Sequence, residues 1–271
     1  RSHRLRRRRL VSNSSTVSSN ALIEFRDIHK AFGAKRILQG LSMEVGHKEV
    51  FFIIGTSGVG KSVTIKHLIG LLRVDEGEIH FDGRRIDSLS ENDFYPVRKR
   101  IGMVFQHSTL FDSMTLRQNV ALPLRKHQGM GTKEALKRAD ELLERVNMHA
   151  FSHSGPATLS DGMKKRAAIA RTLAMEPQVV LFDEPTTGLD PVNARRIDRL
   201  IRELSDDLGV TSIVVSHDLT SIFSIADRIT FIYQGKAYKS GTRQEFEHSD
   251  DPIVRQFISG NSHGPMETPG F

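Results

Sequence analysis

A chain of 271 residues with 38% hydrophobic and 26% charged residues has a globular composition and can form one large domain or two small ones. It contains no cysteine, which excludes disulfides, cysteine-ligated zinc, iron–sulfur clusters and thiol catalysis. No apolar run approaches the roughly 18 residues that a membrane-spanning helix needs. We therefore expect a globular chain with no membrane-crossing segment.

The positive charge is concentrated at the beginning of the chain. The formal net charge is +7, but residues 1–20 hold six arginines and no acid, so residues 21–271 carry only +1. Residues 1–20 are otherwise rich in Ser and Asn, and this composition predicts a disordered basic arm. A transit peptide and an arm that touches anionic lipid remain open. The nearly neutral remainder argues against a nucleic-acid partner.

From residue 21 onward, strands alternate with helices. Short apolar runs predict strands, at Leu22–Phe25, Val50–Ile54, Val179–Phe182 and Ser212–Val215. Apolar residues at helical spacing predict helices, at Gly60–Leu72, Lys133–Asn147, Asp161–Met175 and Pro191–Leu208. This alternation predicts an α/β fold with a largely parallel sheet.

The segment Gly55–Ser62 fits the P-loop pattern G-x-x-x-x-G-K-[ST] between a predicted strand and a predicted helix. Its glycines let backbone N–H groups point at phosphate oxygens, and the following helix N-terminus favours an anion. We predict ATP contacts from the whole loop: Gly55, Thr56, Ser57, Gly58, Val59, Gly60, Lys61 and Ser62. Lys61 is expected to reach the β- and γ-phosphates, and Ser62 to offer its hydroxyl to Mg²⁺.

Two acids follow the apolar strand at Val179–Phe182. Ligands of open α/β sheets bind at the carboxyl ends of the strands. Asp183 is therefore a candidate ligand of Mg²⁺, directly or through water. Glu184 is a candidate for polarising the water that attacks the γ-phosphate.

Five further features stand in a fixed order along the chain: Phe32, Gln106, Leu159–Met163, Thr187–Asp190 and Ser216–Asp218. Together with the P-loop and the acid pair, this order resembles the ATP-binding subunits of ABC transporters over about residues 22–245. The resemblance implies an ATPase with a P-loop NTPase (RecA-like) core. It also implies an N-terminal antiparallel β subdomain, an inserted helical subdomain at about residues 108–175, an ATPase domain over residues 21–245 and a C-terminal extension over residues 246–271.

The resemblance also implies roles for single residues within one copy. An aromatic residue at the place of Phe32 stacks on the adenine ring. Gln106 contacts Mg²⁺ and the water and links the nucleotide to the membrane partner. His217 holds the γ-phosphate and the catalytic water.

Other implied roles belong to a pair of chains. In the family, two copies face each other head to tail and enclose two ATP molecules. Ser160 and Gly162 then touch the γ-phosphate of the opposite copy, and Asp190 crosses the interface. Asp161 departs from the usual Leu-Ser-Gly-Gly-Gln motif, and we expect it to point away from the phosphate, near the N-terminus of its own helix. This departure puts the hydrolysis rate in doubt more than the fold.

Met163, the following Lys164–Arg166 and the stretch Asp251–Gly260 resemble the ATPases of Mla/MCE lipid-transport systems. This resemblance implies phospholipid transport between the inner and outer membranes, at the cytoplasmic face of the inner membrane. It implies an integral membrane permease, an MCE-domain lipid-binding protein and often a STAS-domain protein as partners.

Simpler interpretations of the residues that resemble lipid-transport ATPases stay open. Lys164–Arg166 could be a solvated helix face. A short helix at residues 252–258 could pack on its own domain or reach a neighbouring subunit. Four apolar residues of the helical subdomain could receive a permease helix, although we favour them as core residues: Phe111, Leu116, Leu122 and Leu124.

Three alternative functions remain. The chain could serve another permease, such as an amino-acid importer, against which Met163 and the C-terminal stretch argue. It could be a soluble scaffold without a permease, or act on nucleic acid. It could also bind nucleotide without hydrolysing it, against which Glu184 and His217 argue.

Overall fold

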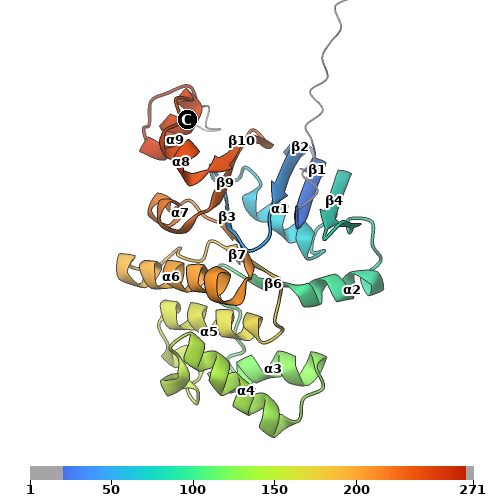
Figure 1. The fold of residues 1–271 in the computed structure, drawn as a ribbon, viewed down its shortest axis with the longest axis vertical. Coiled ribbons are helices and arrows are strands. Elements are labelled where there is room, and N and C mark those ends of the chain that lie inside the picture. Colours follow the sequence, from blue (N-terminus) through green and yellow to red (C-terminus); the bar gives the residue numbers. More distant parts are fainter. Residues whose placement is uncertain (1–20, 267–271) are drawn as a thin grey trace, which may run out of the picture.

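The computed structural model describes residues 21–266, which form two β-sheets and the helices that cover them (Figure 1). The predicted arm at residues 1–20 lies outside the described residues. Within residues 21–266, no helix is both long and apolar enough to cross a bilayer.

The smaller sheet has the order β2-β1-β4-β5, and every neighbouring pair in it is antiparallel. Its strands are β1 (Ile23–Phe32), β2 (Lys35–Val45), β4 (Glu76–Phe81) and β5 (Arg84–Arg85). Alternate residues of β1, among them Ile23 and Phe25, are fully buried, as expected for a sheet with one packed face. This sheet confirms the N-terminal antiparallel β subdomain.

The larger sheet has the order β10-β9-β3-β8-β7-β6. Its strands are β3 (Val50–Gly55), β6 (Ile101–Val104), β7 (Val179–Asp183), β8 (Thr211–Val215), β9 (Arg228–Tyr233) and β10 (Lys236–Thr242). Neighbouring strands from β9 to β6 are parallel, and only β10 is antiparallel to its neighbour. The predicted α/β fold with a mainly parallel sheet is therefore confirmed.

Strand β3 lies inside this sheet and separates two hydrophobic clusters. Phe52 and Ile54 belong to one cluster, and Phe51 and Ile53 belong to the other. All four side chains are fully buried because helices or the smaller sheet cover both faces. This explains why Val50–Ile54 is a continuous apolar run without alternation.

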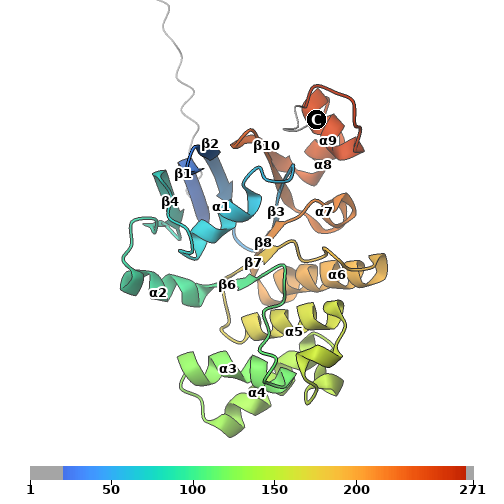
Figure 2. The same ribbon diagram turned by 180° about the vertical axis from the view of Figure 1, so that it is seen from behind.

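The helices that surround the two sheets are α1 (Lys61–Leu68), α2 (Glu91–Arg100), α3 (Leu116–His127), α4 (Thr132–Arg145), α5 (Asp161–Leu173), α6 (Pro191–Leu208), α7 (Leu219–Ile225), α8 (Arg243–Glu247) and α9 (Pro252–Ser259). Two short 3₁₀ helices span His149–Phe151 and Pro156–Thr158. Figure 2 shows α1 beside the antiparallel strands, and α3, α4 and α5 together at the opposite end of the molecule. Helices α3, α4 and α5 form the predicted helical insertion.

Helix α1 ends four residues earlier than predicted, at Leu68. Gly70 has φ +67°, and its N–H donates to the carbonyl of His67 while the N–H of Leu71 donates to that of Lys66. This is the hydrogen-bond pattern of a Schellman motif, which satisfies the last carbonyls and stops the helix.

The apolar residues of the insertion differ in their burial. Leu116 and Leu124 are fully buried in the core, as we favoured from the sequence. Leu122 is half-buried. Phe111 contradicts that interpretation, because half of its surface is exposed. It lies in the loop before α3, where its backbone N–H and carbonyl bond the buried side chain of Asn119 and its ring is left outside.

The C-terminal helices pack on the same chain. Helix α8 includes residue 245 and buries Phe246 in the core, so the ATPase domain and the C-terminal extension are continuous there. In α9, the ring of Phe257 lies 4.8 Å from the ring of Phe231 in the larger sheet, and Val254 is buried. The apolar side of the segment at residues 252–258 is thus covered by its own domain.

We predict that Phe257→Ala lowers the free energy of unfolding by about 2 kcal/mol, because it removes a partly buried ring that packs against Phe231. Urea unfolding would measure the change. Arg255→Ala is the matched control, since Arg255 is exposed on the same helix. Equal stabilities for the two variants would contradict the packing described for α9.

Candidate functional site

Three neighbouring parallel strands end at the same edge of the larger sheet. Within the ladders, Ile53 of β3 and Asp183 of β7 both pair with Val215 of β8. The P-loop after β3, the acid pair at the end of β7 and the Ser216–Asp218 segment after β8 therefore emerge side by side. This is the edge at which open α/β sheets bind ligands.

Two P-loop glycines cannot be replaced without strain. Gly55 has φ +149°, and a Cβ atom there would lie 2.4 Å from the backbone oxygen of Ile232. Gly60 has φ +109°, and a Cβ atom there would press on the side chains of Ile37 and Leu38. Glycine lets the loop pass close to its neighbours and turn into α1.

Lys61 is held by the loop that precedes it. Its Nζ donates to the carbonyls of Gly55 at 2.9 Å and Thr56 at 3.0 Å. Burial lowers the pKa of Lys61, while the carboxylates of Glu184 and Asp183 act in the opposite direction. An ammonium group has three N–H donors, so one remains for a phosphate oxygen.

Ser62 and Asp183 join the P-loop helix to β7. The Ser62 hydroxyl donates to Oδ1 of Asp183 at 2.6 Å, although the two residues lie 121 positions apart. A hydroxyl and a carboxylate are oxygen donors of the kind that Mg²⁺ accepts beside phosphate oxygens and water. The pair therefore fits a magnesium ion that arrives with a nucleotide.

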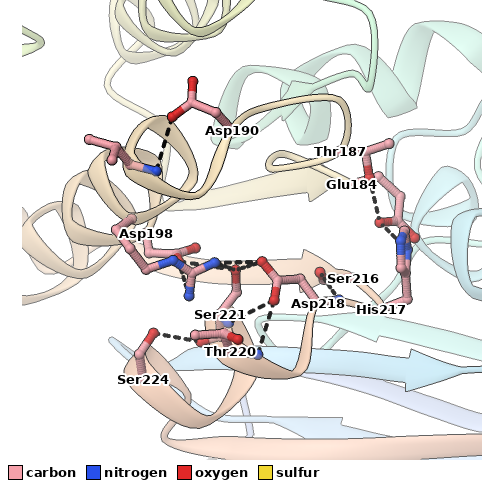
Figure 3. Close-up of polar contacts among 12 residues, drawn as sticks. Glu184, Thr187, Asp190, Asp198, Ser216, His217, Asp218, Thr220, Ser221 and Ser224 are labelled. Carbon is pink, nitrogen blue, oxygen red and sulfur yellow. Dashed lines mark hydrogen bonds and ion pairs between the residues drawn. The ribbon is translucent and has the colours of Figure 1, made fainter. Parts of the chain in front are cut away.

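Glu184 is fixed at its backbone and at its side chain, and Figure 3 shows the side-chain contacts. Its Oε2 accepts a hydrogen bond from Thr187 Oγ1 at 3.1 Å and lies 2.9 Å from Nδ1 of His217. Its N–H donates to the carbonyl of Val215 at 2.9 Å. Its φ is +51°, a left-handed conformation that is rare for a residue with a side chain and that clusters at functional sites.

Lys61, Ser62, Glu184 and His217 line one groove of about 740 Å³, and Asp183 lies beside it, bonded to Ser62. Its lining is formed by Phe32, Lys35, Ile37, Ser57, Gly58, Gly60, Lys61, Ser62, Val63, Gln106, Glu184, Thr187 and His217. Phe32 has 47% of its surface exposed, which leaves its ring free to stack on a base. The structure thus gathers around one groove most of the residues predicted for nucleotide binding and hydrolysis.

Ser160, Gly162 and Asp190 do not line this groove. Ser160 caps α5, where its Oγ accepts a hydrogen bond from the N–H of Met163, and Gly162 is buried in the first turn. Asp190 caps α6 by accepting from the N–H groups of Val192 and Asn193. Their predicted contacts to the opposite copy remain predictions.

Asp161 lies in the first turn of α5, and 74% of its side chain is exposed. Its Oδ1 is 3.3 Å from Nζ of Lys164, one turn further along. An acid near a helix N-terminus interacts favourably with the helix dipole. The side chain therefore has the local partners that we expected from the sequence.

The interpretation of Lys164–Arg166 as a solvated face is wrong for two of its three residues. Lys165 is only 4% exposed. Arg166 is half-buried and donates to the carbonyls of Val146 and Asn147. Only Lys164 has the surface ion pair typical of a solvated face.

The sequence analysis also missed a polar network behind His217 (Figure 3). Asp218 caps α7 and bonds Arg195 of α6 and the hydroxyl of Ser221. Ser221 in turn donates to Asp198, whose carboxylate is buried. The network ties α6, whose N-cap is Asp190, to the loop that carries His217.

The sequence contains only weak indications of the roles of Thr187, Arg195 and Asp198. Thr187 and Glu184 are three positions apart, but this spacing brings them together only in the tight turn that the chain makes there. Arg195 and Asp198 show the i,i+3 spacing of a helical ion pair. Nothing in that spacing reveals that Asp198 is buried.

A protein-family model and several individual proteins match this chain over more than half of its length. A family model described as ABC transporter matches residues 38–187. The chain is 38% identical to the intermembrane phospholipid transport ATP-binding protein MlaF of Escherichia coli, over 90% of this chain and 91% of that protein. It is also 38% identical to the chloroplastic protein TRIGALACTOSYLDIACYLGLYCEROL 3 of Arabidopsis thaliana, over 92% of this chain and 76% of that one.

A methionine import protein is similarly close. The chain is 42% identical to the ATP-binding protein MetN of Rhizobium johnstonii over 86% of its own length, and it spans 64% of that relative. Among solved structures, CbiO1 of Clostridium perfringens, part of the ABC transporter complex CbiONQ, matches with a TM-score of 0.79 and 30% identity, over 88% of this chain and 94% of that one. A dimeric ATP-binding cassette bound to ADP and phosphate matches with a TM-score of 0.74 and 30% identity, over 82% and 98%.

Burial of Asp198 predicts a pH-dependent stability. Burial raises the pKa of its carboxyl from 3.8 to about 6, despite the hydrogen bond from Ser221 and the charge of Arg195. As pH rises from about 4 to about 6, the unfolded chain releases this proton before the folded chain does, so the group lowers the free energy of unfolding. The loss is at most about 3 kcal/mol and is complete above about pH 6.

Asp198→Asn removes this titration. The difference in free energy of unfolding, native chain minus variant, should fall by about 2 to 3 kcal/mol between about pH 4 and pH 7 in urea titrations. A difference that stays constant across this range would contradict the buried, raised-pKa carboxyl.

Proposed function

The chain belongs to the ABC transporter family, as an ATPase whose hydrolysis is coupled to transport, and from this premise we propose that it powers the movement of phospholipid between membranes. The observation that carries the catalytic part is the meeting of Lys61, Ser62 and Glu184 around one groove, with Asp183 bonded to Ser62 at its edge. The lipid part rests on the resemblance of residues in α5 and α9 to lipid-transport ATPases.

The groove offers contacts for both the phosphates and the base of a nucleoside triphosphate. The P-loop N–H groups and the third N–H of Lys61 meet the phosphates, and Phe32 offers a ring face to the base. Mg²⁺ would be held by Ser62, by Asp183 directly or through water, and by Gln106, and it would neutralise charge on the β- and γ-phosphates.

Glu184 then acts as the group that orients and polarises the attacking water. Its carboxylate is only 14% exposed and is steered by Thr187 and His217. His217 has 65% of its side chain exposed, so its ring can turn from Glu184 toward a γ-phosphate. This exchange would make the carboxylate available only when nucleotide is present.

A second copy of the chain completes the site. Ser160 and Gly162 begin α5 with backbone N–H groups at a helix N-terminus, a ready position for a phosphate on a facing copy. ATP that binds the closed pair better than the open chains favours closure, and loss of the γ-phosphate favours opening.

The proposed cargo rests on two sequence features that resemble those of lipid-transport ATPases. One is Met163 with its following basic residues, and the other is the stretch Asp251–Gly260. The similarity to MlaF extends over most of both chains. We accordingly propose an integral membrane permease, an MCE-domain protein and a STAS-domain protein as partners. The chain would bind to the permease at the cytoplasmic face of the inner membrane.

Methionine import is the second candidate, because the chain is 42% identical to MetN of Rhizobium johnstonii. The nucleotide chemistry is the same in both cases. The two proposals differ only in the permease and its cargo, so the partner rather than the ATPase rate separates them.

We predict that Glu184→Gln lowers the ATP hydrolysis rate by roughly a hundred-fold or more, because the amide no longer accepts a proton from water. ATP affinity should be retained, and ATP should hold the two copies together, as measured by phosphate release and light scattering. Glu203→Gln, at an exposed acid of α6, is the control. Full turnover by Glu184→Gln would refute the catalytic assignment.

The cargo is tested by recovering the tagged chain from membranes in mild detergent and identifying the co-purified proteins and lipids by mass spectrometry. A permease, an MCE-domain protein and bound phospholipid are the expected result. Recovery of a methionine permease would replace the cargo proposal, and recovery of soluble partners alone would refute coupling to transport.

A further inference from the structure

Lys165 is a buried cation that the proposed mechanism does not yet use. It lies in α5, on the turn that follows Ser160, and is 4% exposed. Its Nζ donates to two backbone carbonyls, that of Gln106 at 3.2 Å and that of Glu184 at 3.3 Å. A single ammonium group thus bridges the backbone of two residues that line the nucleotide groove.

Burying the ammonium group of Lys165 costs free energy unless the protein provides interactions that replace its contacts with water. Burial lowers the pKa of Lys165, and the carboxylates of Asp161 and Glu184 partly oppose this. A buried ammonium needs hydrogen-bond acceptors to offset its lost hydration. The carbonyls of Gln106 and Glu184 supply these acceptors, so both hydrogen bonds help to stabilise the buried Lys165. The adjacent Lys164 instead points outward to Asp161.

Lys165 contacts Glu184, a residue whose backbone conformation is strained. Glu184 has φ +51° and precedes Pro185, a position that disfavours helical backbone conformations. Conformations of this kind persist only where several contacts fix them. The N–H of Glu184 donates to Val215, and its carboxylate contacts His217 and Thr187. Its carbonyl accepts from the backbone N–H of Thr187 within the same turn and from Lys165, which is the contact that comes from α5.

The contact with Gln106 extends the same ammonium to a second segment that lines the groove. Gln106 follows β6 and lies in the segment that leads to α3. Lys165 therefore joins three parts of the chain: the first turns of α5, the segment after β6 and the turn after β7. The helical insertion has a direct hydrogen-bonded connection to the groove through this one side chain.

We propose that Lys165 is a positioning residue that fixes the backbone of Gln106 and Glu184 from α5, so that ATP hydrolysis depends on the position of the helical insertion. The inference rests on the proposed ATPase mechanism and adds a means of regulating it. A shift of α5 would move both carbonyls and, through the Glu184 backbone, the carboxylate that orients the water. The P-loop contacts to nucleotide would be unaffected.

The test compares three variants of the full chain in its transporter complex. Lys165→Met keeps the length of the side chain and removes its donors. Lys165→Gln keeps an N–H donor for one of the carbonyls. Lys164→Met removes the neighbouring lysine, whose ammonium group pairs with Asp161. For each variant, kcat and KM for ATP, nucleotide affinity and Tm are measured.

Lys165→Met should lower kcat about ten-fold, with KM and nucleotide affinity within about two-fold of the native values. Lys165→Gln should recover part of the loss, and Lys164→Met should match the native chain. Native kcat in Lys165→Met would overturn the inference. So would a parallel loss of kcat, affinity and Tm, which would show a purely structural role.

Failure of this inference differs from failure of the proposed function. An unchanged Lys165→Met leaves the catalytic role of Glu184 standing. If Glu184→Gln itself hydrolyses ATP at the native rate, the proposed mechanism fails regardless of Lys165.

Discussion

The hydrogen bond between Ser62 and Asp183 is the contact on which the rest of the site depends. It spans 2.6 Å between the first turn of α1 and the end of β7, and so it joins the phosphate loop to the carboxylate strand. The register of the parallel sheet makes this contact possible, because β3 and β7 both pair with β8. The larger sheet thereby places a loop that recognises phosphate beside acids that can hold a metal ion and activate water.

Near this pair, the buried ammonium groups of two lysines form their hydrogen bonds with backbone carbonyls and not with carboxylates. Lys61 is held by two P-loop carbonyls, and Lys165 by the carbonyls of Gln106 and Glu184. The hydrogen bonds of the two ammonium groups thus go to backbone carbonyls and not to the side chains of Asp183 and Glu184. The two acidic side chains are thereby left available to a metal ion and to water.

Sequence reasoning succeeded where local chemistry determines the structure. Helix α6 begins and ends as predicted, because Asp190 caps its N-terminus, Pro191 occupies its first position and Gly209 adopts the left-handed conformation after its last residue. The P-loop lies where its motif placed it. Helix α1 was predicted too long, because the apolar spacing continues past Gly70, where a Schellman motif ends the helix.

The sequence could not reveal contacts that depend on distant parts of the chain. A run of two lysines and an arginine is usually a solvated face, and only the packed structure shows that Lys165 turns inward to two loops that lie 59 and 19 positions away. The burial of Asp198 between α6 and α7 is likewise invisible in a helix that is rich in charged residues. Both residues follow from tertiary packing, whereas the motif residues follow from local pattern.

A double-mutant cycle on Ser62 and Asp183 tests most directly whether these residues act as one unit. The ATPase kcat/KM is measured for Ser62→Ala, Asp183→Asn and the double variant at saturating Mg²⁺. Our account predicts that the double variant is about as impaired as Asp183→Asn alone, because either change disrupts the same metal-binding pair. Fully additive losses would contradict it, since they would show that the two side chains act independently.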